Sequence, residues 1–133
     1  MAQRSPPPPH RGRALIVEDE LMFALNLEAE MHTLGFDVCD LAANGHQASR
    51  LAMSNQPDVV LMDVNLEGGR EGIEVARWLR MVCEAPIVFT SGYTDRETVE
   101  RIHEQVPDAP VLSKGSYYYP LAAAVAGITP HQH

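Results

Sequence analysis

The sequence has little cysteine and no long apolar run. Its two cysteines, Cys39 and Cys83, match neither a disulfide framework nor a metal-binding pattern, so we expect them to be reduced core residues. No apolar run approaches the roughly 18 residues that a membrane span needs, and the N-terminus has no apolar stretch typical of a secretory signal. These absences exclude disulfide-stabilised secreted proteins and membrane-spanning proteins, and they favour a cytoplasmic location.

Basic residues are also few, and lysine is the rarest of them. The chain has 10 basic and 18 acidic residues, a net charge of −8, and Lys114 is its only lysine. Arg4, Arg11 and Arg13 lie in an acid-free stretch of 13 residues, so the rest of the chain carries a net charge of −11. A body that acidic repels phosphate backbones, so we expect no nucleic-acid binding; a divalent cation or a basic partner suits it better.

The length of 133 residues predicts one folded domain with a short segment at each end. Residues 1–12 include four consecutive prolines after Ser5 and offer nothing apolar to bury, so we expect a disordered, Pro-rich arm. Residues 130–133 are expected to form a frayed tail. The domain is then expected to span residues 13–129.

Short apolar runs alternate with segments of helical periodicity along the domain. Strands are predicted at 14–17, 37–41, 58–62, 86–90 and 110–112, and helices at 21–34, around 48–52, at 72–83, from 94 onward and at 119–128. We interpret Asn44 and Gly45 as a turn and Thr94 with Glu97 as a capping box. In the helix over 72–83 we expect four inward residues: Val75, Leu79, Val82 and Cys83. The (βα)5 order predicts an α/β fold, a doubly wound, five-stranded parallel sheet covered on both faces.

Polar residues follow the predicted strands where, in such sheets, function lies. Glu18 and Asp19 follow the first strand and Asp63 the third, a charge of −3 that Mg²⁺ with its oxygen ligands would relieve. A carboxylate can also act as a nucleophile toward phosphorus. That chemistry needs a fixed cation and a hydrogen-bond donor for the phosphoryl oxygens, and Lys114 and Ser91 are the right types of residue after the fifth and fourth strands.

The chain resembles a known family. From about Arg13 to Ile128 it is similar to the receiver (CheY-like) domain of two-component response regulators. The resemblance is carried by four motifs in order: residues 15–20 (LIVEDE), 58–63 (DVVLMD), 89–93 (FTSGY) and 112–114 (LSK). It implies the flavodoxin-like strand order 2-1-3-4-5. It also implies a signalling protein rather than an enzyme, with only self-catalysed phosphoryl acceptance and autodephosphorylation.

The resemblance implies a role for each residue of the cluster. Asp63 looks like the phosphoacceptor and Asp19 like the direct Mg²⁺ ligand. Glu18 would bind the metal mostly through water, and the backbone carbonyl of Asn65 would complete the metal site. Ser91 looks like the switch hydroxyl, and Lys114 would pair with the phosphoryl oxygens. The donor would be a phosphohistidine on a sensor histidine kinase or a histidine phosphotransfer protein.

Three positions depart from the family pattern. Gly115 stands where family members usually carry proline after the lysine, and Val111 stands where they usually carry an aromatic residue. The loop over 66–72 lacks the usual proline and looks one residue longer, so we expect it to be mobile. We also expect the segment 114–117 to be the most mobile part of the site without phosphate.

The sequence leaves several functions possible. Only 19 residues follow Lys114, so we expect a stand-alone receiver whose output is protein–protein contact or phosphoryl relay. The alternatives are a degenerate receiver that acts as a phosphorylation-independent interaction module, a small aspartyl-phosphate phosphohydrolase, and a fragment of a longer hybrid protein. Asn65 disfavours the phosphohydrolase, because it cannot act as a carboxylic acid two residues after the nucleophile. A homodimer is a further expectation, through mixed charges of the fourth helix and Tyr117, Tyr118 and Tyr119.

Overall fold

A computed structural model describes residues 10–66, 71–92, 95–114 and 118–130, with the backbone alone at 118 and 119. The sequence predictions for the arm up to residue 9, for the loop over 67–70, for 115–117 with Tyr117, and for the end of the tail lie outside the described residues. So do those for the side chains of Tyr118 and Tyr119.

Five strands and five helices alternate through the described residues, as the sequence predicts. The strands are β1 (Gly12–Val17), β2 (Phe36–Ala42), β3 (Val59–Asp63), β4 (Ile87–Ser91) and β5 (Val111–Ser113). The helices are α1 (Leu21–Thr33), α2 (Gly45–Asn55), α3 (Glu71–Val82), α4 (Arg96–Gln105) and α5 (Tyr118–Ala124). All strand pairs are parallel and the order is β2-β1-β3-β4-β5, so both the fold class and the strand order are confirmed.

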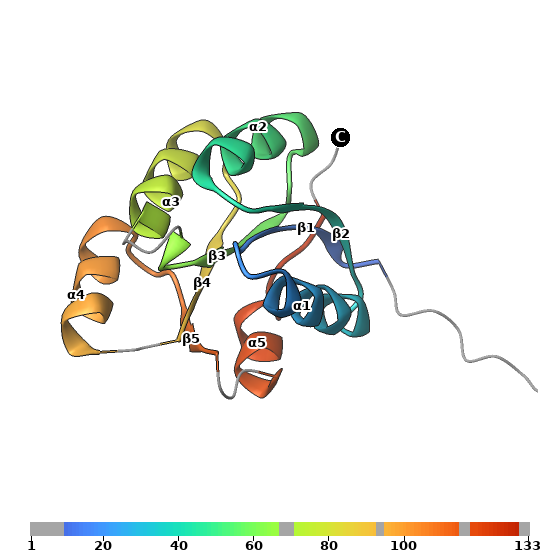
Figure 1. The fold of residues 1–133 in the computed structure, drawn as a ribbon. Coiled ribbons are helices and arrows are strands. Elements are labelled where there is room, and N and C mark those ends of the chain that lie inside the picture. The colour runs from blue at the N-terminus through green and yellow to red at the C-terminus, as the bar shows by residue number, and fades with distance from the viewer. Residues whose placement is uncertain (1–9, 67–70, 93–94, 115–117, 131–133) are drawn as a thin grey trace, which may run out of the picture.

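The sheet lies between two layers of helices (Figure 1), with α1 and α5 on one face and α2, α3 and α4 on the other. Each face has its own apolar core, because successive side chains of a strand point to opposite faces. Leu15 and Phe89 pack toward α2, α3 and α4, whereas Ile16 and Val88 pack toward α1 and α5. None of the helices in the described part of the chain is long and apolar enough to cross a bilayer.

Two helix starts differ from the sequence prediction. Asn44, interpreted as a turn residue, is the N-cap of α2, and its side chain accepts a hydrogen bond from Gln47 N at 2.9 Å. Asp95 rather than Thr94 is the N-cap of α4, with Oδ1 accepting from Thr98 N at 2.6 Å. Both errors have one cause: Asn and Asp favour turns and helix caps alike, because their short side chains bond to nearby backbone N–H groups.

The buried face of α3 and the length of α5 also differ from the sequence prediction. In α3 the fully buried side chains include Ile73 and Ala76 beside the predicted Leu79, whereas the predicted Val82 is 45% exposed. The buried face is therefore rotated relative to the predicted one. The prediction relied on large apolar residues and overlooked the small residue Ala76. The last helix, predicted over 119–128, ends at Ala124.

The folded domain also begins earlier than residue 13. Arg11, assigned to the arm, lies with its guanidinium 5.0 Å from the ring centroid of Phe36 and donates to Val125 O at 2.8 Å. Gly12 is the first residue of β1. A cation that stacks on an aromatic ring and binds carbonyls belongs to the body of the domain.

Candidate functional site

The carboxyl ends of β1, β3, β4 and β5 bring the predicted site residues to one edge of the sheet. Backbone hydrogen bonds extend the sheet just beyond the strands: Val64 N donates to Thr90 O at 3.0 Å and Lys114 N to Ser91 O at 2.9 Å. Asp63 is paired with Thr90 across the sheet. The site therefore rests on rigid backbone, which suits a group that must be held in place for chemistry.

Three carboxylates form the centre of the site. One oxygen from each of Glu18, Asp19 and Asp63 lies within 4.8 Å of the others. Glu18 and Asp63 are buried, at 3% and 2% exposure, whereas Asp19 is exposed. Two buried carboxylates beside an exposed third are an oxygen donor set of the kind that Mg²⁺ binds, and they leave an open side for water or a phosphoryl group.

A single ammonium group faces the two buried carboxylates. Lys114 Nζ lies 2.6 Å from Glu18 Oε1 and 3.4 Å from Asp63 Oδ2. Its side chain is 20% exposed, so the ion pairs are largely shielded from water. The predicted convergence of Lys114 with Glu18 and Asp63 is thus present, and its shortest contact is with Glu18.

The protonation of this cluster follows from its charges. Burial, the hydrogen bond with Asp63 and the charge of Asp63 raise the pKa of Glu18 to about 8, although Lys114 opposes the shift. Burial by itself lowers the pKa of Lys114, but its hydrogen bond to Glu18 and the charges of Asp63 and Glu18 outweigh that effect, so its pKa is raised. One ammonium cannot neutralise three carboxylates, and a proton is retained in place of a second cation.

Two further predicted residues lie beside the acceptor carboxylate. Asn65 is exposed, and its backbone N–H donates to Asp63 Oδ1 at 3.1 Å, which fixes the orientation of that carboxylate. Ser91 is fully buried at the end of β4 and pairs with Ser113 in the sheet. Val111, in the position where the family usually has an aromatic residue, is half-buried against the core cluster under α3 and α4.

Sequence reasoning missed two residues that shape the site. Phe23, on the first turn of α1, places its ring centroid 4.5 Å from Lys114 Nζ, in cation–π contact. Gly72 packs on the acceptor strand: its N–H donates to Val64 O at 3.3 Å, and a Cβ there would overlap the carbonyl oxygen of Asp63. Gly72 lies at the start of the helix predicted over 72–83, and a glycine at such a position can indicate that the backbone approaches a neighbouring segment closely.

Comparison with known proteins identifies the family. The family model described as "Response regulator receiver domain" matches residues 14–114. The chain belongs to this family. Receiver domains are the signalling modules of two-component systems rather than enzymes in the usual sense, and they interact with kinases and downstream targets.

The most informative relatives are response regulators. The transcriptional regulatory protein PdtaR of Mycobacterium tuberculosis is 34% identical over 92 residues, which cover 69% of this chain and 44% of that protein. The phyllosphere-induced regulator PhyR of Methylorubrum extorquens is 34% identical over 83 residues, 62% of this chain and 31% of that protein. This chain thus spans less than half the length of either relative.

Solved structures of receiver domains have the same fold. The signal receiver domain of a modulated diguanylate cyclase from Desulfovibrio desulfuricans G20 superposes with a TM-score of 0.71 at 30% identity, covering 86% of this chain and 94% of that one. The similarity therefore extends over nearly the whole described fold of this receiver domain.

Proposed function

We propose that this receiver domain accepts a phosphoryl group on Asp63, with Mg²⁺ as its cofactor. The observation that carries the proposal is the buried carboxylate of Asp63 at the end of β3, held by Asn65 N–H and facing the only lysine of the chain. In the reaction, an oxygen of Asp63 attacks the phosphorus of a phosphohistidine. The new P–O bond forms as the P–N bond breaks, and the imidazole leaves with a proton from solvent.

The chain's own residues hold and orient the reacting group. Lys114 is placed to move from Glu18 onto a phosphoryl oxygen, and Ser91 supplies a hydroxyl donor at the end of the neighbouring strand. Glu18, Asp19, Asp63 and the backbone carbonyl of Asn65 would hold Mg²⁺, which supplies charge neutralisation for the transferred phosphoryl group. The donor set fits the ion, because the cluster has more carboxylates than the one ammonium can neutralise.

The phosphodonor is, in this proposal, a sensor histidine kinase or a histidine phosphotransfer protein. Its phosphohistidine must reach Asp63, so the donor protein must cover this edge of the sheet. Leu21 and Met22, at the start of α1 beside Asp19, are 63% and 69% exposed. Exposed apolar side chains next to an acceptor group are suited to contact a partner protein there.

Mass spectrometry of the intact protein tests the acceptor. After incubation with acetyl phosphate and Mg²⁺, the wild-type protein should gain one phosphoryl group, and the gain should disappear without Mg²⁺ and in Asp63→Asn. Asp40→Asn, an exposed aspartate of β2, is the matched control and should be phosphorylated normally. Phosphorylation of Asp63→Asn at the wild-type rate would refute the assignment.

The same experiment separates the alternatives. A wild-type protein that gains no phosphoryl group under any condition favours the degenerate receiver. Continuous hydrolysis of an unrelated ester such as p-nitrophenyl phosphate favours the phosphohydrolase. Autodephosphorylation is measured as the decay of the phosphorylated mass after removal of the donor.

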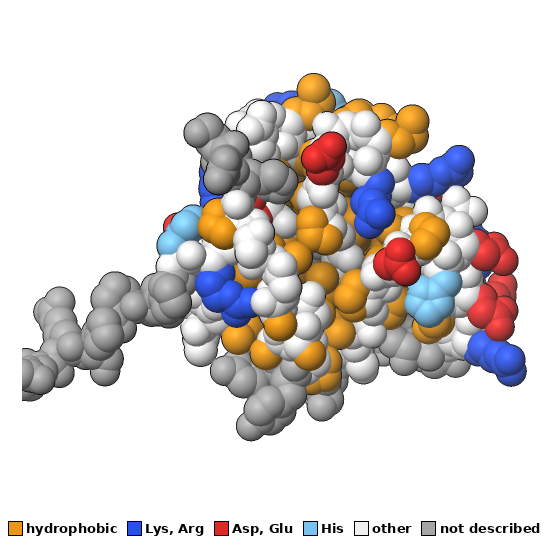
Figure 2. Space-filling view, turned by 180° about the vertical axis from the view of Figure 1, so that it is seen from behind, with side chains coloured by type: hydrophobic (Ala, Val, Ile, Leu, Met, Phe, Trp, Pro, Cys, Tyr) orange, Lys and Arg blue, Asp and Glu red, His pale blue; other side chains and the backbone are white. Residues whose placement is uncertain are grey.

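A homodimer through the α4 side of the molecule stays a prediction. Arg96 and Glu100 on α4 form an exposed pair at 3.2 Å, and acidic and basic side chains crowd the α4 edge, at the right of Figure 2. Such mixed charges suit a self-complementary contact. Sedimentation with and without phosphate tests it, and a monomer at tens of micromolar in both states would exclude it.

A further inference from the structure

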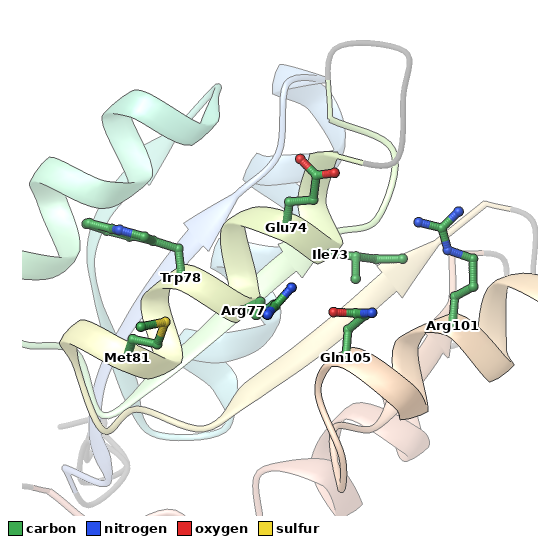
Figure 3. Close-up of a pocket in the computed structure, with 7 residues that line it drawn as sticks. All are labelled: Ile73, Glu74, Arg77, Trp78, Met81, Arg101 and Gln105. Carbon is green, nitrogen blue, oxygen red and sulfur yellow. The ribbon is translucent and has the colours of Figure 1, made fainter.

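A groove of about 410 Å³ runs between α3 and α4, apart from the carboxylate cluster. Its lining includes Ile73, Arg77 and Met81 from α3, which share one side of that helix because they are four residues apart, together with Trp78, which follows Arg77 and extends away from α4 (Figure 3). Arg101 and Gln105, one turn apart, contribute from α4 (Figure 3). Two neighbouring helices with a groove between them form a surface on which a third helix can bind.

The groove is apolar along α3. Ile73 is buried, whereas Trp78 is 41% and Met81 80% exposed. A tryptophan and a methionine left this open to water favour contact with a partner, because burying them removes a large apolar area from water. Trp78 is also the single tryptophan of the chain.

The groove is basic where the two helices face each other. Arg77 and Arg101 both extend into the space between α3 and α4 (Figure 3), and neither has an ion pair or hydrogen bond within the described part of the chain. By contrast, Arg96 on the same helix as Arg101 is paired with Glu100. Among the described lining residues, only Glu74 is acidic. Two guanidinium groups without an ion pair to any described residue, on a chain of net charge −8, mark this groove as a local site for carboxylates.

Both walls of the groove are connected to the proposed acceptor site. α3 follows β3, which ends at Asp63, and Gly72 at its start rests on the backbone of Asp63 and Val64. α4 follows β4, which ends at Ser91. A displacement of either strand end therefore changes the separation of the two helices.

We propose that the groove between α3 and α4 binds an acidic, amphipathic helix of a partner protein, and that phosphorylation of Asp63 changes its affinity for that helix. The second part rests on the proposed function. Apolar residues of the helix would contact Ile73, Trp78 and Met81, and its carboxylates would pair with Arg77 and Arg101. The chain's own N-terminal arm is a poor occupant, because its one charged side chain outside the folded domain is Arg4, which the groove would repel.

Fluorescence of Trp78 provides a direct assay. The probe is a synthetic peptide of about four helical turns, with leucines on one face, glutamates elsewhere and no tryptophan. We expect a saturable change in Trp78 emission, and affinity about tenfold weaker in the double variant Arg77→Glu/Arg101→Glu. Arg80→Glu, an exposed arginine of α3 outside the groove, is the matched control and should bind normally. Met81→Ala should weaken binding, whereas Met53→Ala on α2 should not.

Each result bears on the proposal. No saturable binding, or equal binding by the wild-type protein and the Arg77→Glu/Arg101→Glu variant, would overturn it, as would tighter binding of a peptide with lysines in place of glutamates. Self-association that competes with the peptide would assign the groove to a second copy instead. The titration is repeated on protein whose phosphorylation is verified by mass. Equal affinity in the two verified states would overturn the coupling, whereas failure to phosphorylate at all would refute the proposed function and leave the groove assignment intact.

Discussion

Lys114 Nζ lies 2.6 Å from Glu18 Oε1, although the two residues are 96 positions apart in the chain. Before phosphorylation the lysine is therefore bound to a carboxylate other than the proposed acceptor, and the phosphoryl group must compete with Glu18 for it. The bond is shielded from water and links the ends of β1 and β5, which β3 and β4 separate in the sheet.

The first prediction concerns pH. The pKa of Glu18 is about 8 in the folded protein, against 4.5 as its ordinary value. Between these two pH values the folded protein binds more protons than the unfolded one. The contribution of Glu18 to the stability of the metal-free protein is therefore fully present below pH 4.5 and is lost as the pH rises through 8. Urea unfolding at several pH values should show this loss, and Glu18→Gln should reduce it. If the unfolding free energy of Glu18→Gln depended on pH as steeply as that of the wild-type protein, the raised pKa of Glu18 would be contradicted.

The second prediction removes the ammonium group. Lys114→Ala leaves Glu18 and Asp63 buried without a cation, so it should destabilise the metal-free protein by about 1–3 kcal/mol. The loss should be larger at alkaline pH, where Glu18 is ionised, and smaller where it is protonated. Urea unfolding at the two pH values measures this, with Arg80→Ala as the exposed-cation control. Phosphorylation from acetyl phosphate should persist but slow, and Lys114→Arg should not restore the rate, because a planar guanidinium is bulkier than an ammonium.

The third prediction concerns Asp19. Asp19→Asn should weaken Mg²⁺ binding at least about tenfold, because a charged oxygen ligand is lost. It should also slightly stabilise the metal-free protein, since it removes a negative charge beside the buried carboxyl groups of Glu18 and Asp63. Calorimetric titration and thermal unfolding measure the two effects, with the exposed neighbour Glu20→Gln as the control. A metal-free melting temperature that drops by several degrees would contradict the repulsion.

The sheet and its site were predictable from the sequence because their signals are local. Residues 59–62 and 86–89 are continuous apolar runs, and strands buried on both faces require such runs. Once the strands are parallel, Glu18, Asp63 and Lys114 must follow them at one edge, and the structure confirms that convergence. The metal ligand set and the roles of Ser91 and Asn65 stay predictions.

The remaining features depend on tertiary contacts that leave little trace in sequence. The buried face of α3 includes Ala76, which periodicity underweights beside the larger but exposed Val82. The partnership of Lys114 with Phe23 joins residues from opposite ends of the chain and follows no local pattern. Arg11 looked like part of a Pro-rich arm because it closely follows the four prolines of residues 6–9, yet its stacking partner Phe36 lies on β2, 25 residues further along the chain.

The last prediction tests how α3 is seated on the acceptor strand. A Cβ on Gly72 would overlap the carbonyl oxygen of Asp63 and lie 2.9 Å from that of Val64, and backbone cannot move aside as a flexible side chain can. Gly72→Ala should therefore destabilise the protein by about 3 kcal/mol and slow phosphorylation by acetyl phosphate. Gly127→Ala is the matched control, because a Cβ there meets nothing within 4 Å, and its effect should stay within about 0.5 kcal/mol. Equal unfolding free energies for the two variants would show that α3 is not seated on the backbone of Asp63.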